Sequence, residues 1–183
     1  GGLLDVTTHP EFESNGLVYL TYSVSGEGGS STRLGRGRLD RENGRLTDFE
    51  PLYTARPFVQ SSGHYGSRVV FDREGYVYVS VGDRQFKNFG PDHVGQTLDD
   101  DLGSVLRLHD DGSIPADNPF VSDPEASDAI WTYGNRNPQG LTVHPDTGEV
   151  WETEFGERDG DEINVLERGA NYGWPVAANS GGY

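Results

Sequence analysis

The sequence contains no cysteine and no methionine, and Lys87 is its single lysine. Without cysteine, the chain can form neither a disulfide framework nor a thiolate metal site. No apolar run approaches the roughly 18 residues that a transmembrane helix needs, so we do not expect the chain to span a membrane. The chain starts at Gly1 without a recognisable signal peptide. We expect that a leader has been removed or that the chain is an excised piece.

Basic residues are scarce, with 14 Lys and Arg against 30 Asp and Glu, which gives a formal net charge of -16 at pH 7. Such a surface repels the phosphates of nucleic acids and anionic lipids, so we expect no nucleic-acid partner. An acidic excess with almost no lysine is typical of proteins from high-salt hosts. Ordinary solubility at neutral pH is the alternative, and the charge gives little indication of a substrate.

Short runs rich in β-branched and aromatic residues lie between frequent glycines. The runs at 17–24, 68–71, 76–81 and 149–153 alternate with the period of a β-strand. No amphipathic helix of ten residues or more is apparent. We therefore predict an all-β protein.

Three segments of the chain repeat one pattern, in which a strand is followed by a polar turn with glycine and by a strand carrying an aromatic residue. The turn glycines are Gly16, Gly75 and Gly148, and their spacing suits a four-stranded blade with its loops. This pattern predicts a β-propeller of four-stranded antiparallel blades, and a β-sandwich with coincidental hairpins is the alternative. Three blades cannot close a ring, so we expect residues 1–183 to be part of a larger propeller.

A histidine in a glycine-flanked turn is the first candidate catalytic residue. His64 lies between Gly63 and Gly66 and just before a predicted strand. A histidine can take a proton from a substrate hydroxyl, and Asp83, at the end of the following strand, could orient its ring. The alternatives are a histidine that only stabilises a turn and an aspartate that caps a strand.

Two later loops carry further polar chemistry. Arg136 and Asn137 lie in a tight loop, where the planar guanidinium suits a carboxylate ligand or, alternatively, a local acid. The acidic loop at 154–162 offers carboxylates and turn carbonyls to a hard cation such as Ca²⁺, although a solvated acidic loop is equally compatible. We interpret His9, His93, His109 and His144 as structural or surface residues, and the run Asp99-Asp100-Asp101 as a solvated loop.

Together these stretches resemble the soluble quinoprotein sugar dehydrogenases of the glucose and sorbosone dehydrogenase family, and more closely its aldose dehydrogenase branch. The resemblance runs from the first residue almost to the last. The motifs that carry it are Gly1-Gly2-Leu3-Leu4-Asp5, Gly63-His64-Tyr65-Gly66-Ser67-Arg68, Arg136-Asn137-Pro138-Gln139-Gly140, Gly160-Asp161-Glu162-Ile163-Asn164 and Asn171-Tyr172-Gly173-Trp174-Pro175.

The resemblance implies a six-bladed propeller, of which this chain covers about half, with PQQ and Ca²⁺ bound at one end of the ring. His64 matches the family's catalytic base, which takes the proton of the sugar C1 hydroxyl while hydride moves to PQQ, and Asp83 matches the carboxylate that supports this base. Arg136 and Asn137 match residues that contact PQQ.

The resemblance also implies two calcium sites. Gly156 and Glu157 match the positions whose backbone carbonyls hold the calcium bound to PQQ. Glu162 and the backbone carbonyl of Tyr172 match a further site in the aldose branch. Glu157 is a departure, because the family usually has proline there. A carbonyl ligand survives that change, although the loop loses rigidity.

The implied activity is the oxidation of aldose sugars to lactones, with electrons passed to a quinone, a cytochrome or an artificial dye, in the periplasm or outside the cell. The chain has about half the usual family length and lacks the family's later PQQ-contacting blades, so we expect little activity from residues 1–183 alone. Two other functions remain open: a metal-dependent sugar lactonase, and a non-catalytic binding propeller.

Overall fold

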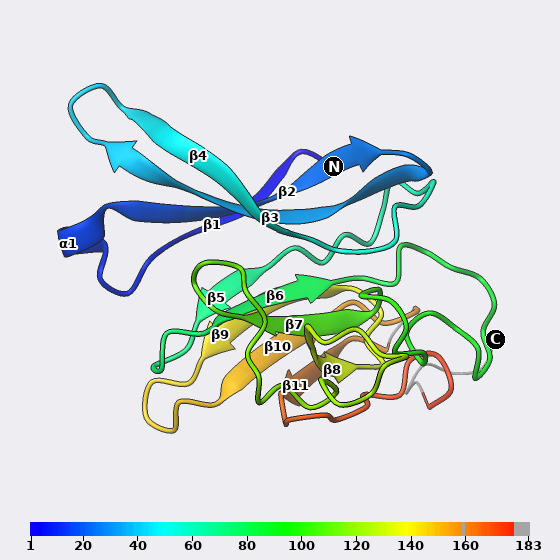
Figure 1. Ribbon diagram of the computed structural model, residues 1–183. Coiled ribbons are helices and arrows are strands. Elements are labelled where there is room, and N and C mark those ends of the chain that lie inside the picture. The colour runs from blue at the N-terminus through cyan, green and yellow to red at the C-terminus, as the bar shows by residue number, and fades with distance from the viewer. Residues whose placement is uncertain (159, 178–183) are drawn as a thin grey trace.

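The computed structural model describes residues 1–158 and 160–177, and these residues form three antiparallel β-sheets (Figure 1). The first sheet has the order β1-β2-β3-β4, with the strands Leu3–Thr8, Leu17–Gly26, Gly29–Asp40 and Arg45–Thr54. The second has the order β5-β6-β7-β8, with Val69–Phe71, Val77–Val81, Ser104–Leu108 and Ile130–Tyr133. The third has the order β9-β10-β11, with Pro138–Val143, Val150–Glu154 and Glu162–Val165.

Each sheet is a meander of consecutive strands, as the repeated pattern in the sequence predicts. The three predicted turn glycines lie between β1 and β2, β5 and β6, and β9 and β10, and all have positive φ: 66° at Gly16, 87° at Gly75 and 82° at Gly148. Among the described residues the only helix is the short α1, Phe12–Asn15, which ends where the Gly16 amide bonds to the Phe12 carbonyl at 2.8 Å. The predicted absence of long helices is confirmed for this part of the chain.

The first strands of the three sheets, β1, β5 and β9, lie next to one another. Arg68, just before β5, ties them together, because its Nη1 donates to the Leu4 carbonyl (2.9 Å) and its Nε to the Gln139 carbonyl (2.5 Å). Figure 1 shows the three sheets stacked one after another around these strands. This is the arrangement of successive propeller blades, so the predicted fold class is confirmed.

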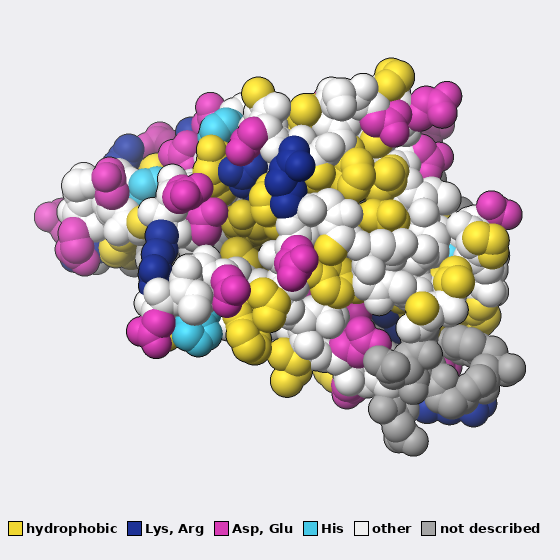
Figure 2. Space-filling model, turned by 90° about the horizontal axis from the view of Figure 1, so that it is seen from below, with side chains coloured by type: hydrophobic (Ala, Val, Ile, Leu, Met, Phe, Trp, Pro, Cys, Tyr) yellow, Lys and Arg dark blue, Asp and Glu magenta, His cyan; other side chains and the backbone are white. Residues whose placement is uncertain are grey.

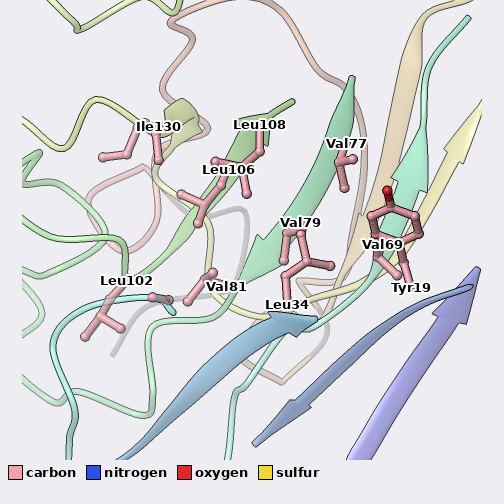
Figure 3. Packing of buried hydrophobic residues seen from close by; sticks show 12 residues of the cluster. Tyr19, Leu34, Val69, Val77, Val79, Val81, Leu102, Leu106, Leu108 and Ile130 are labelled. Atoms are coloured by element: carbon pink, nitrogen blue, oxygen red, sulfur yellow. The ribbon is translucent and has the colours of Figure 1, made fainter. Parts of the chain in front are cut away.

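The hydrophobic core follows the alternation of the strands. Val77, Val79 and Val81 of β6 point to one side and pack with Tyr19 and Leu34 of the first sheet (Figure 3). Tyr78, which points to the other side of β6, packs with Val105, Val150 and Leu166 toward the third sheet. The second sheet is therefore buried on both faces, as a middle blade must be.

The outer faces of the two flanking sheets carry apolar side chains that the described residues leave exposed. On the first sheet, Leu3 is 77 % exposed beside a shallow groove that Leu20 and Phe49 also line. On the third sheet, Ile163 is 71 % exposed and Phe155 is exposed as well. Figure 2, which views the molecule from below, shows hydrophobic side chains grouped on that face between scattered acidic ones.

The acidic run Asp99–Asp101 departs from expectation. The prediction of a solvated loop is wrong for Asp101, which is buried between the first and second sheets. Its carboxylate accepts hydrogen bonds from the Tyr53 hydroxyl (3.1 Å), the Arg56 amide (2.8 Å) and the Ser127 hydroxyl (2.5 Å). Asp101 therefore joins two blades rather than solvating a loop.

Membrane insertion through a helix has no support in the described part of the chain, since none of its helices is long and apolar enough to cross a bilayer.

Candidate active site

Five of the predicted site residues lie together at one end of the strands in the second and third sheets. His64 precedes β5, Asp83 follows β6, Arg136 and Asn137 precede β9, and Gly156 follows β10. Antiparallel pairing brings these strand ends together. Two backbone bonds fasten the loops to one another, because the Asp83 amide donates to the Arg136 carbonyl (2.8 Å) and the Phe155 amide to the Asn137 carbonyl (3.2 Å).

His64 and Asp83 form the expected pair. His64 Nδ1 lies 2.6 Å from Asp83 Oδ1, with the His64 side chain 15 % exposed and the Asp83 side chain 1 % exposed. A carboxylate accepts from Nδ1–H, so this bond leaves Nε2 of His64 as the unprotonated nitrogen. A partly exposed, oriented imidazole of this kind can accept a proton from a hydroxyl.

The backbone around His64 is held in an uncommon conformation. His64 has a φ of 48°, which is unfavourable for a side chain with a Cβ, and Gly66 has a φ of 58°. Gly82 lies so close to the loop that an added Cβ would come within 2.4 Å of the His64 carbonyl oxygen. The glycines therefore permit a close approach that places the imidazole over Asp83.

Asn137 supports this loop from the neighbouring blade. Its side-chain oxygen accepts from the Gly66 amide (3.2 Å) and from Gln139 Nε2 (3.3 Å), and the residue is buried. The structure thus gives Asn137 a role in holding the His64 loop. Its predicted contact with PQQ stays a prediction.

Arg84 is a site residue that the sequence did not reveal. This buried arginine donates to the carbonyls of Gly63 (2.9 Å), Ser30 (2.9 Å) and Ser61 (2.6 Å). Its guanidinium lies 3.7 Å from the centre of the Tyr65 ring. Burial lowers the pKa of Arg84. The residue fixes the segment that leads into His64, and no local sequence pattern marked it.

Two aromatic residues complete the surroundings of Asp83, and sequence reasoning missed both roles. The Trp174 indole Nε1–H donates to Asp83 Oδ2 at 2.8 Å. His93, expected to be structural or on the surface, is fully buried with its Nε2 3.7 Å from the same oxygen. Asp83 Oδ1 also accepts from the Gln85 amide at 2.8 Å. Both oxygens of the carboxylate are therefore engaged.

Arg136 is placed to meet an anion but is paired with an acid of its own chain. Its Nη2 lies 2.6 Å from Glu157 Oε2, and its Nη1 donates to the Phe155 carbonyl at 3.1 Å. The guanidinium also lies 5.1 Å from the centre of the Trp174 ring. Its Nε is buried and has no hydrogen-bond partner among the described residues. The guanidinium thus retains donor capacity for a ligand.

The third sheet carries a face of buried acids next to this loop. Glu154 pairs with Glu162 across β10 and β11, and Glu152 pairs with Asn164, so all four side chains share one face. Burial raises the pKa of Glu154 to about 7, and repulsion from Glu162 adds to this effect. Burial also holds the pKa of Glu152 well above its usual range, and repulsion from Glu154 and Glu162 adds to it. Glu152 Oε2 is buried without a hydrogen-bond partner in the described part of the chain.

Of the residues matched to calcium ligands, Glu162 belongs to this acidic face, and Gly156 and Glu157 follow Glu154 at the end of β10. Gly156 admits no side chain, since an added Cβ would meet the Gly160 carbonyl, and the Glu157 carbonyl accepts from the Gly160 amide at 3.2 Å. The Tyr172 hydroxyl accepts from the Glu167 amide at 2.9 Å. No cluster of three or more His, Asp or Glu side chains in metal-binding geometry occurs within residues 1–158 and 160–177. The two predicted calcium sites stay predictions.

Comparisons with known proteins give a consistent result. The family model described as Glucose / Sorbosone dehydrogenase matches residues 1–183. Aldose sugar dehydrogenase YliI of Escherichia coli (strain K12) is 42 % identical over 178 residues, which cover 97 % of this chain and 47 % of that protein.

Two solved structures extend the likeness. The apo-form of the soluble aldose sugar dehydrogenase from Escherichia coli superposes with a TM-score of 0.91 at 40 % identity, over 97 % of this chain and 50 % of that one. The PQQ-bound aldose sugar dehydrogenase from Streptomyces coelicolor superposes with a TM-score of 0.77 at 27 % identity, over 97 % of this chain and 49 % of that one. The chain spans about half the length of these relatives.

Proposed function

The chain belongs to the Glucose / Sorbosone dehydrogenase family, and we propose that the complete protein containing it is a quinoprotein that oxidises the C1 hydroxyl of aldose sugars. The observation that carries this proposal is the pair of His64 and Asp83, in which Nδ1 lies 2.6 Å from Oδ1. Arg136 lies at the same end of the strands. Relatives named as aldose sugar dehydrogenases, one of them in a PQQ-bound form, support the same chemistry.

His64 serves as the base in this proposal. Its Nε2 accepts the proton of the sugar hydroxyl, while Asp83 stabilises the imidazolium that results. The buried carboxylate holds the ring in one tautomer, so Nε2 is ready to accept before the sugar arrives. PQQ, when bound, supplies the acceptor for the hydride.

Arg136 holds a carboxylate of PQQ in this proposal. Its buried, unpartnered Nε and its planar donor set fit a planar polycarboxylate. Ca²⁺ is the other cofactor of the proposal, because the loop after β10 offers backbone carbonyls and the adjoining face of the third sheet carries the acids Glu154 and Glu162. Two calcium ions belong to the proposal. The backbone carbonyls of Gly156 and Glu157 would hold the one that accompanies PQQ, and the Glu162 carboxylate and the Tyr172 carbonyl would hold the other.

The remaining blades of the ring would cover the apolar outer faces of the first and third sheets, which carry Leu3 and Ile163. The whole propeller would have six blades, and a quinone, a cytochrome or an artificial dye would take the electrons. Periplasmic or extracellular localisation belongs to the same proposal.

The experiment compares the complete protein with His64→Ala and Arg136→Ala variants. PQQ binding is followed by titration in the presence of Ca²⁺, and turnover by dye reduction with a panel of aldoses. We expect His64→Ala to bind PQQ but to lose turnover, and Arg136→Ala to bind PQQ more weakly. His109→Ala, at an exposed histidine, is the matched control.

Failure of the complete protein to bind PQQ would overturn the proposal. Hydrolysis of sugar lactones in place of dye reduction would point to the lactonase. Sugar binding without turnover would point to a binding propeller.

A further inference from the structure

The carboxylate of Asp83 is buried in the candidate site, and three different segments of the chain surround it. His64 comes from the loop before β5, Gln85 and His93 from the segment after β6, and Trp174 from beyond β11. A buried carboxylate is stable only where donors compensate its lost hydration. The position of each donor therefore decides where the two oxygens point.

The donors are divided between the two oxygens. Oδ1 faces His64 Nδ1 at 2.6 Å and also accepts the Gln85 amide. Oδ2 accepts the Trp174 indole N–H at 2.8 Å. Without that second anchor the carboxylate could rotate about its Cβ–Cγ bond, and the geometry of Oδ1 toward His64 would no longer be fixed.

His93 adds a second N–H on the side of Oδ2. Its Nδ1 accepts the Gly95 amide at 2.9 Å, so the proton of the neutral ring is on Nε2. Nε2 lies 3.7 Å from Asp83 Oδ2 and forms no hydrogen bond within the described residues. Burial lowers the pKa of His93, against the opposing effects of Asp83 and the Phe86 backbone, and so favours the neutral ring.

The rings of His93 and Trp174 are held against each other and against Phe89. The His93 ring stacks on Phe89 with centroids 6.4 Å apart, and the Trp174 ring meets His93 edge-on at 6.1 Å. Both N–H groups thus have fixed directions. The other charged group beside Asp83 is Arg84, whose guanidinium bonds to backbone carbonyls of the loop before His64.

We propose that Trp174 and His93 are positioning residues for Asp83. The Trp174 indole N–H bonds to Oδ2 and the N–H of the neutral His93 ring lies 3.7 Å from the same oxygen, and this arrangement directs Oδ1 at His64 and keeps His64 in the tautomer with Nε2 free to accept a proton. This inference rests on the proposed function for its catalytic meaning. The structural part of the inference is that the rings of Trp174 and His93 determine the tautomer of His64. This part does not depend on any cofactor.

Two pairs of variants test the proposal in the complete protein. Trp174→Phe removes the indole N–H and keeps an aromatic ring, with Trp151→Phe as control, since Trp151 Nε1 has no partner among the described residues. His93→Phe removes the N–H donor and His93→Gln retains one, with His109→Phe as control. Thermal unfolding of every variant identifies those that fail to fold.

The decisive readout is NMR of the cofactor-free protein labelled with ¹⁵N in histidine only, with His64 assigned through His64→Gln. The wild type is expected to show His64 protonated at Nδ1, with a strongly downfield Nδ1–H resonance. Trp174→Phe and His93→Phe are expected to shift that resonance and mix the two tautomers, whereas His93→Gln and the controls are expected to retain the wild-type signature.

Turnover at saturating PQQ and Ca²⁺ gives the second readout. Loss of a hydrogen bond to a buried charge lowers kcat by about tenfold or more in Trp174→Phe, with the KM for sugar nearly unchanged. We expect a smaller loss in His93→Phe, restored by His93→Gln. Unchanged His64 signals in folded Trp174→Phe and His93→Phe would overturn the proposal, and unchanged signals in His93→Phe alone would overturn the part that concerns His93. Changed signals in a protein that binds no PQQ would refute the proposed function and leave this inference standing.

Discussion

Replacing Glu157 by glutamine is predicted to tighten the binding of PQQ. Glu157 Oε2 lies 2.6 Å from Arg136 Nη2, so the acid occupies the guanidinium that we assign to the cofactor. The side chains of Arg136 and Glu157 are 13 % and 30 % exposed, so the pair is partly shielded from water. A carboxylate of PQQ must displace Glu157 or share Arg136 with it, and both cost free energy.

The magnitude follows from the geometry. At an effective dielectric constant of about 20, unit charges about 4 Å apart interact with about 4 kcal/mol, and solvation and screening reduce the net value of a partly exposed pair to about 1 kcal/mol. Because 1.4 kcal/mol corresponds to a factor of ten, Glu157→Gln is expected to bind PQQ about three- to tenfold more tightly. The backbone carbonyl that we assign to Ca²⁺ is the same in both proteins.

The assay is a PQQ titration of the complete protein at saturating Ca²⁺ and two salt concentrations. The gain should shrink at high salt, since salt screens exposed charges. Glu149→Gln, which removes a similar charge from an exposed position, is the control and should leave the affinity unchanged. Equal or weaker PQQ binding by Glu157→Gln would refute the competition between Glu157 and the cofactor for Arg136.

Three further predictions concern the pair of His64 and Asp83 and the junction between the first two blades. Asp83→Asn should lower kcat in the dye assay by about 10²- to 10⁴-fold while the circular dichroism spectrum stays unchanged, because an amide does not hold the imidazolium; activity within a few-fold of wild type would refute the role of Asp83. Burial, with repulsion from Asp99 and Asp101, raises the pKa of Asp100 to about 7 from 3.8. The folded state therefore retains a proton that the unfolded state has lost, and stability should fall by about 4 kcal/mol as pH rises from about 4 to above 7. In urea titrations across this range Asp100→Asn, which keeps an acceptor for the Leu102 amide, should remove most of that fall, and an unchanged pH profile would contradict the assignment. Asp101→Ala should lower the free energy of unfolding by about 3 kcal/mol or more, because it leaves the Tyr53 hydroxyl, the Ser127 hydroxyl and the Arg56 amide without their acceptor; a change below about 1 kcal/mol in urea denaturation would show that water replaces it.

Much of the fold could be predicted from the sequence because its signals are local. A strand, a glycine turn and a second strand follow one another directly along the chain. The alternation of Val77, Tyr78 and Val79 already divides the two faces of β6. The partnership of His64 and Asp83 was accessible for the same reason. Both residues flank one hairpin, whose strands end at the same edge.

The remainder depends on how blades pack, which a single sequence does not display. Trp174, in the segment after β11, reaches Asp83 at the end of β6, and Asp101 reaches Tyr53 of the first sheet. Polar residues such as His93, Arg84 and Asp101 carry no period that marks them as buried. Their partners are backbone groups and side chains that only the packing of the propeller brings close. The composition of the run Asp99–Asp101 therefore suggested a solvated loop, whereas Asp101 joins the first and second sheets.

Rapid-mixing spectroscopy of the reduction of bound PQQ tests the central claim most directly. The complete protein, loaded with PQQ and Ca²⁺, is mixed with the aldose that it oxidises fastest, and wild type is compared with His64→Ala. Our account predicts rapid loss of the oxidised quinone absorbance in the wild type, and a rate lower by at least about 10²-fold in His64→Ala at equal PQQ occupancy. Equal rates in the two proteins would contradict it, because the sugar hydroxyl would then lose its proton to a group other than His64.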